Sequence, residues 1–254
     1  MITTSVLAIC TLAALLAGCI DAVAGGGGLI TLPALLLTGV PPHTALACNK
    51  VSACLGTATA LGTFARSGLV VWRLAAIGAG FALAGSAIGS RLALSLDANT
   101  LGKVLIVLLP FAMMATLIPQ KDRATPLVSD GPRFYVLAPL CCLGVGVYDG
   151  FFGPATGCFF ILALHLLVRV HLLQASATTK VLNLASNAGA ALVFILSGDV
   201  VWTLALCMAA GSITGNWLGS RMAIRIGGAL VRRALIVSLS LLMISLIWTY
   251  FLKG

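Results

Sequence analysis

Near its N-terminus the chain reads Gly18-Cys19-Ile20-Asp21-Ala22-Val23-Ala24-Gly25-Gly26-Gly27-Gly28, which places four consecutive glycines at the end of an apolar run. Glycine destabilises a helix interior, so we expect one helix to end at these glycines and another to begin at Leu29. The second half of the chain contains a related stretch, Gly146-Val147-Tyr148-Asp149-Gly150-Phe151-Phe152-Gly153-Pro154. We therefore predict two broken helices, each with an aspartate shortly before the break.

The composition excludes a water-soluble protein. Of the 254 residues, 60% are hydrophobic and only 8% are charged, whereas soluble domains carry about 25% charged residues. Apolar residues occur throughout, so disorder is excluded as well, and the natural solvent of the chain is a lipid bilayer. The net charge of +9 fits Lys and Arg in cytoplasmic loops better than a nucleic-acid surface, because no basic patch is interleaved with aromatic residues. We expect the bilayer, and no nucleic acid, as a partner.

The lengths of the apolar runs predict an all-α integral membrane protein. A helix needs about 20 residues to cross the ~30 Å hydrocarbon core. The runs that are long enough are 43–65, 70–95, 174–197, 200–222 and 230–252, with 101–118 marginal. The runs that are too short are 28–40, 134–148 and 151–168, and we expect these in the hairpins that contain the broken helices.

The two halves of the chain match each other in one register. Gly85-xxx-Gly89-Ser90-Arg91 returns as Gly215-xxx-Gly219-Ser220-Arg221, and Ala45-x-Ala47-xx-Lys50-Val51 returns as Ala175-x-Ala177-xx-Lys180-Val181. Several motifs in one order and spacing indicate an internal duplication. We predict a first repeat at 1–118, a polar cytoplasmic linker at 119–133 and a second repeat at 134–254.

Each repeat is predicted to be a re-entrant or short-limbed helical hairpin followed by three transmembrane helices. A hairpin returns the chain to its starting side and three crossings do not, so the second repeat must be inverted relative to the first. The positive-inside rule supports this arrangement, because it places most basic residues on one side. That side carries Arg66, Arg73, Lys121, Arg123, Arg133, Arg169, Arg221, Arg225, Arg232 and Arg233, and the other side carries Arg91, Lys103 and Lys253.

Inverted repeats with short, glycine-interrupted helices are typical of secondary transporters that bind their substrate near the membrane midplane. A half-helix that begins inside the membrane directs its free N–H groups and the positive end of its dipole at that point. Such an end attracts anions. Two such ends, one at each glycine cluster, predict one central anion site.

The motifs together resemble those of the sulfite exporter TauE/SafE family of membrane transporters. The resemblance rests on the stretch from Gly18 to Pro33, on Gly39-Val-Pro41-Pro42, and on the run from Tyr148 to Gly157. It extends over essentially the whole chain, including Ala177-Thr178-Thr179-Lys180-xx-Asn183-xxx-Asn187. It implies transport of small sulfur-containing anions, such as sulfite and organosulfonates, across the bacterial inner (plasma) membrane by a multi-pass protein.

The predicted substrate-binding residues are of three kinds: backbone donors at the helix breaks, lysines, and neighbouring amides and hydroxyls. They are Gly25, Gly26, Gly27, Gly28, Asn49, Lys50, Gly153, Thr156, Gly157, Thr179, Lys180, Asn183 and Asn187. The amides and hydroxyls could equally bond helix to helix.

The duplicated charged residues allow more than one interpretation. Asp21 and Asp149 could cap the broken helices, or act in gating or proton coupling. Lys50 and Lys180 lie ~10 Å into their helices. They could extend to the lipid headgroups, neutralise an anion, or pair with the local aspartate.

We therefore predict a secondary transporter of a small anion, and not an enzyme. An anion channel would use the same residues, and an intramembrane thiol or lipid enzyme is a weaker alternative because no Ser or Cys has a His at a recognisable spacing. The eight cysteines and three histidines show no metal-ligand spacing, so we expect neither a metal nor a cofactor. The sequence leaves open whether the protein assembles as a homodimer.

Overall fold

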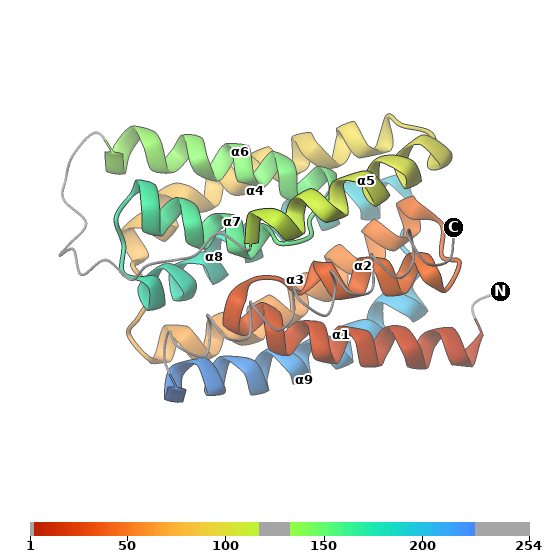
Figure 1. Ribbon diagram of the computed structural model, residues 1–254, viewed down its shortest axis with the longest axis horizontal. Coiled ribbons are helices and arrows are strands. Elements are labelled where there is room, and N and C mark those ends of the chain that lie inside the picture. The colour runs from red at the N-terminus through yellow and green to blue at the C-terminus, as the bar shows by residue number, and fades with distance from the viewer. Residues whose placement is uncertain (1–2, 117–132, 227–254) are drawn as a thin grey trace.

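The computed structural model describes residues 3–116 and 133–226 (Figure 1). Within these ranges the chain is helical, and no strand occurs. The helices are α1 (Thr4–Ala24), α2 (Gly28–Leu37), α3 (Pro42–Arg66), α4 (Trp72–Leu94), α5 (Ala98–Thr116), α6 (Ala138–Phe151), α7 (Thr156–Leu162), α8 (Leu172–Ser197) and α9 (Trp202–Ile226). Short π-helical segments, η1 (Arg133–Leu137) and η2 (Ala163–Leu167), precede α6 and follow α7.

The predicted spanning runs correspond closely to α3, α4, α5, α8 and α9. The predicted span at 230–252 lies outside the described residues, as does the linker at 119–133 except for Arg133. Loop residues define several helix starts. Before α5, for example, the Asp97 carboxylate accepts a hydrogen bond from the Thr100 backbone N–H at 2.9 Å, and this bond lowers the pKa of Asp97.

Three described helices are both long and apolar enough to cross a membrane: 4–23, 72–94 and 172–197. Helices α3 and α9 have 25 residues each, which is sufficient length, but they contain more polar side chains. Helix α1 corrects one expectation, because the first limb of the first hairpin is not short. It has 21 residues, and only the returning limb, α2, is short, with 10 residues.

Both predicted helix breaks are present. Helix α1 ends at Gly25, which adopts the left-handed conformation (φ 77°) and donates its N–H to the Asp21 carbonyl. Helix α2 then begins at Gly28. In the second half, α6 ends at Phe151 and α7 begins at Thr156. In Figure 1 the α1–α2 hairpin extends from the end where α1 begins, and the α6–α7 hairpin extends from the opposite end.

Glycines allow two long helix pairs to pack with their backbones in contact, α1 against α9 and α4 against α6. A Cβ atom on Gly215 would lie 2.0 Å from the Leu15 carbonyl oxygen, and one on Gly89 would lie 2.0 Å from that of Val147. The Gly-xxx-Gly motifs of α4 and α9 therefore pack these helices closely against their partners. Between the two pairs, α3 contacts α8, and the two hairpin tips face this contact.

Candidate functional site

The two glycine clusters lie in direct backbone contact, although they are far apart in the sequence. A Cβ on Gly25 would lie 2.4 Å from the Cα of Gly157, and a Cβ on Gly157 would lie 2.3 Å from the Cα of Gly25. Gly28 approaches the backbone of Pro154 in the same way, at 3.0 Å. Only residues without a side chain permit this approach, so the glycines join the tips of the two hairpins.

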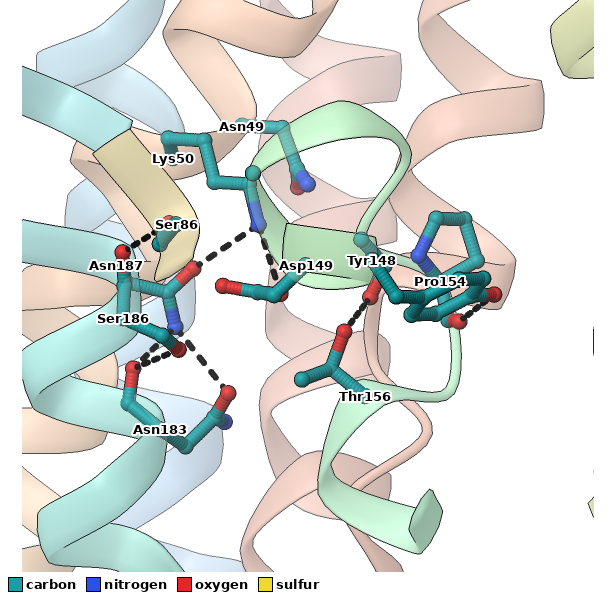
Figure 2. A network of polar contacts seen from close by, with 12 residues as sticks. Asn49, Lys50, Ser86, Tyr148, Asp149, Pro154, Thr156, Asn183, Ser186 and Asn187 are labelled. Carbon is teal, nitrogen blue, oxygen red and sulfur yellow. Dashed lines mark hydrogen bonds and ion pairs between the residues drawn. The ribbon is translucent and has the colours of Figure 1, made fainter. Parts of the chain in front are cut away.

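Polar side chains hold the second tip in shape. Thr156 Oγ1 donates to the Gly153 carbonyl at 2.6 Å, and Tyr148 Oη donates to the Pro154 carbonyl at 2.6 Å (Figure 2). The Tyr148 ring also contacts the edges of Phe152 and Phe159. These contacts satisfy carbonyls that the helix break leaves free.

The charged residues form two ion pairs that cross between the halves of the chain. Lys50 Nζ lies 2.7 Å from Asp149 Oδ1. Lys180 Nζ lies 3.6 Å from Asp21 Oδ2 and also donates to the Asp21 carbonyl oxygen. Pairing of each lysine with its local aspartate is therefore wrong, because each tip lies against the long helix of the other half. Both lysines are buried, at 1% and 0% exposure, so extension to the headgroups is wrong as well.

The Lys50 ammonium group lies at the second hairpin tip. Besides Asp149, it donates to Asn187 Oδ1 at 3.4 Å (Figure 2), and it lies so close to Gly153 that a Cβ there would be 2.8 Å from Nζ. Asp149 Oδ2 is buried and has no hydrogen-bond partner among the described residues. One carboxylate oxygen thus holds Lys50, while the other is unsatisfied.

A small polar cavity lies where the tips, α1, α3, α8 and α9 meet. Its volume is about 40 Å³, which is enough to hold ordered water. Its charged lining residues are Asp21, Lys50 and Asp149, and its amides and hydroxyls come mainly from α3, α8 and α9.

Most of the predicted site residues line this cavity. They are Asp21, Gly25, Gly27, Gly28, Asn49, Lys50, Asp149, Gly153, Thr156, Gly157, Asn183 and Asn187. Gly26, Thr179 and Lys180 are buried but are not among the lining residues. The duplication in the sequence therefore does not produce two equivalent sites, because only Lys50 faces the cavity.

Hydrogen bonds orient the amides of the site. Thr31 Oγ1 donates to Asn49 Oδ1 at 2.6 Å, which leaves the Asn49 N–H groups as donors. Asn187 Nδ2 donates to the Asn183 carbonyl at 2.8 Å, so its Oδ1 faces Lys50. The alternative that these amides bond helix to helix is thus correct in part, because Asn49 bonds to Thr31 of α2 and Asn187 to Lys50 of α3, while both amide residues also line the cavity.

Several lining residues did not appear among the predicted ones. They are Ala14, Ala17, Gly18, Thr31, Ser52, Ala53, Thr57, Ser212 and Asn216. Asn216 could have been found, because it is an amide inside an apolar run, where polar side chains are costly. The small residues carry no such signal, since small residues are common wherever membrane helices pack closely.

An all-helical chain with candidate membrane spans, broken helices and a buried charged cavity has the features of a membrane transporter. A family profile described as sulfite exporter TauE/SafE matches residues 10–246. The chain belongs to this family of membrane transporters.

Curated relatives agree with this assignment over most of their length. The chain is 36% identical to the probable membrane transporter protein YfcA of Escherichia coli (strain K12), over 93% of this chain and 88% of the relative. It is 37% identical to a probable membrane transporter protein of a Sinorhizobium species, over 91% and 88%, and to one of Haemophilus influenzae, over 86% and 85%. No solved structure matches the chain.

Proposed function

We propose that the protein is a secondary carrier of a small anion, a sulfur oxyanion or organosulfonate, in the bacterial inner membrane. One observation carries this proposal: a buried lysine ammonium group, Lys50, faces a small polar cavity between the tips of two broken helices. A buried charged residue in a membrane protein usually lines the path of a substrate.

The groups around Lys50 suit an anion. Asn49 lines the cavity, and its N–H groups are available as donors because its Oδ1 accepts from Thr31. The glycine tips bring backbone close to the same space. An anion that enters competes with Asp149 for Lys50, because the ion pair already occupies one side of the ammonium group. Lys180 neutralises Asp21, which also lines the cavity, and this pair holds the first tip against α8.

Charge balance favours transport of the anion together with a proton. The two lysines and two aspartates sum to zero, so a bound anion leaves a net negative charge in a region of low dielectric constant. Protonation of Asp149, whose Oδ2 has no hydrogen-bond partner in the described part of the chain, removes that charge. Protonated Asp149 also releases Lys50 to the anion.

The size of the cavity and the family support a sulfur oxyanion. A cavity volume of about 40 Å³ suits an anion of only a few heavy atoms, and the family profile is described as sulfite exporter TauE/SafE. A carrier, and not an enzyme, accounts best for a site that consists of charges and hydrogen-bond donors.

We also propose the inverted repeat as the basis of alternating access. Three features support it: the hairpins extend from opposite ends of the molecule in Figure 1, α1 packs on α9 as α4 packs on α6, and the ion pairs are reciprocal. Movement of one hairpin and its partner helices against the other would open the cavity to each side in turn.

A ligand-stabilisation screen of the purified protein tests the proposal. The ligands are sulfite, alkanesulfonates, sulfate, thiols and carboxylates, and we expect an anion to raise the unfolding temperature of the wild type but not of Lys50→Ala. Proton-coupled, saturable uptake of that anion into liposomes is expected. Stabilisation by thiols alone, or stabilisation that persists in Lys50→Ala, would overturn the proposal, and flux that does not saturate would indicate a channel.

A further inference from the structure

The α9 side of the cavity has a polar lining that the proposed anion site does not use. Ser212 and Asn216 of α9 and Thr57 of α3 line the same cavity as Lys50. Asn216 is 1% exposed, so its side chain is withdrawn from bulk water and from lipid.

The amide nitrogen of Asn216 has hydrogen-bond partners, whereas the amide oxygen has none among the described residues. Nδ2 donates to the Ser212 carbonyl oxygen at 2.9 Å and to Ser212 Oγ at 3.3 Å. Rotation of the amide by half a turn would place its oxygen against the Ser212 carbonyl oxygen, which is repulsive. Oδ1 has no hydrogen-bond partner among the described residues. A buried acceptor without a donor is costly, and this one lines a cavity.

The corresponding place in the other half of the chain is closed. In the register of the duplication, Ser86 corresponds to Asn216 and Ser186 corresponds to Gly56. Ser86 Oγ donates to the Ser186 carbonyl at 2.5 Å (Figure 2), which satisfies both groups and joins α4 to α8. A Cβ at Gly56 would lie 2.6 Å from Asn216 Nδ2, so glycine at this position provides the space for the longer amide.

A second pair of corresponding residues, Ser52 and Leu182, is also polar in one half of the chain and apolar in the other. Ser52 lines the cavity, whereas the corresponding residue, Leu182, is fully buried in an apolar cluster with Cys142 and Leu164. Ser52, Ser212 and Asn216 thus line the cavity, whereas the corresponding residues Leu182, Ala82 and Ser86 are not among its lining residues. This polar part of the lining contains an acceptor, Asn216 Oδ1, that lacks a donor among the described residues.

We infer that Asn216 is a specificity-determining residue that accepts a hydrogen bond from a hydroxyl or amino group carried by the transported anion itself. The inference rests on the proposed function, because it places the anionic group of the same ligand at Lys50. The substrate class is then a short organic anion with a hydrogen-bond donor at its other end, and not a plain alkyl anion. A site with an acceptor for such a donor discriminates strongly against analogues that lack it.

Two pairs of ligands that differ only by a methyl group in place of a hydroxyl test the inference. They are propane-1-sulfonate with 2-hydroxyethanesulfonate, and butanoate with 3-hydroxypropanoate. Calorimetric titration of the purified full-length protein gives the ratio of affinities within each pair. In at least one pair we expect the wild type to bind the hydroxyl ligand about 10-fold or more tightly than the methyl ligand. This ratio requires no variant, so it can be measured whether or not a variant folds.

Two variants test whether Asn216 causes this ratio of affinities. Asn216→Leu is expected to reduce it to less than about 2-fold, while Ser86→Ala, the matched change in the closed half, leaves it unchanged. Equal affinities in the wild type, an unchanged ratio in Asn216→Leu, or no binding of any of the four ligands would overturn the inference. If Lys50→Ala leaves all binding intact, the proposed function fails instead. If sulfite binding depends on Lys50 but no ratio appears, only the Asn216 inference fails.

Discussion

At the scale of single residues, the crossed ion pairs are the most informative feature of the molecule. Lys50 and Asp149 lie at 1% exposure each, in separate halves of the chain. Removal of one member of such a pair leaves an uncompensated buried charge, which typically costs ~3–5 kcal/mol. The lost stability should return only when the true partner is neutralised as well.

The first prediction therefore concerns partner identity. Lys50→Met should lower the free energy of unfolding by ~3–5 kcal/mol, and Lys50→Met combined with Asp149→Asn should recover much of this loss. Lys50→Met combined with Asp21→Asn is the matched control and should recover nothing. Denaturant unfolding in detergent measures all three, and better recovery with Asp21→Asn would show that the pairs are local.

The second prediction separates the roles of the two lysines. Lys50 lines the cavity and Lys180 does not. We expect the Lys50→Met/Asp149→Asn protein to lose binding of the anion, whereas Lys180→Met/Asp21→Asn keeps its affinity within about 3-fold of the wild type. Titration of both double variants with the anion found in the screen provides the comparison. Equal losses would mean that Lys180 contacts the ligand.

At the scale of elements, the breaks in two helices create the site. Helix α1 ends at Ala24 and α6 ends at Phe151, and the returning helices begin a few residues later. The tips can touch only through glycine backbone, since Gly25 and Gly157 approach more closely than any side chain allows.

The third prediction follows from this contact. Gly157→Ala adds a methyl group 2.3 Å from the Gly25 Cα, and overpacking of this kind typically costs ~1–3 kcal/mol. The matched control is Gly80→Ala in α4, where a Cβ would meet nothing within 4 Å. There we expect no loss, or a gain of up to ~1 kcal/mol from better helix propensity. Equal stabilities of the two variants in thermal unfolding would exclude the close contact of the tips.

At the scale of the whole molecule, the loops at one end carry most of the basic residues of the described chain. Arg66, Arg73 and Arg169 lie in or beside loops at one end, and Arg91 lies near the end of α4 at the other. The positive-inside rule therefore predicts that the first end faces the cytoplasm.

The fourth prediction concerns this orientation. Ser67 and Asn99 are exposed in or next to loops at opposite ends of the molecule. In a background without cysteines, Ser67→Cys should react with a membrane-impermeant thiol reagent only after the cells are opened, and Asn99→Cys should react in intact cells. The opposite pattern would reverse the orientation, and reaction of both residues from one side would contradict the fold.

The fifth prediction concerns the cysteine-free protein itself. None of the eight cysteines, all of which lie in the described part of the chain, forms a disulfide, and Cys10, Cys48, Cys142 and Cys158 are buried. Because no cysteine is among the residues that line the cavity, replacement of all eight by alanine should leave anion uptake into liposomes within a few-fold of wild type, at some cost in stability. Complete loss of uptake by a folded cysteine-free protein would favour a thiol-dependent enzyme.

Local features of the sequence account for the helices and their interruptions. The apolar runs predicted α3, α4, α8 and α9 to within a few residues, because hydrophobic length alone decides whether a helix can cross a bilayer. The glycine clusters predicted both breaks, since loss of helix propensity is a local property. The polar residues that interrupt apolar runs, such as Lys50, Asp149 and Asn187, indicated the site, because burial of such groups in lipid is costly.

The partners of these residues depended on the tertiary structure. The sequence duplicates Lys50 as Lys180, but only the packing places one of them at the cavity and the other behind a hairpin tip. The crossed ion pairs, and the place of Asn216 in the same cavity as Lys50, could not be deduced, because each requires segments far apart in the chain to lie side by side. The sequence by itself determined where the helices run and where they break, because propensity and hydrophobicity act over a few residues. Only the tertiary structure decided which charges meet, because electrostatic pairing depends on distances in space.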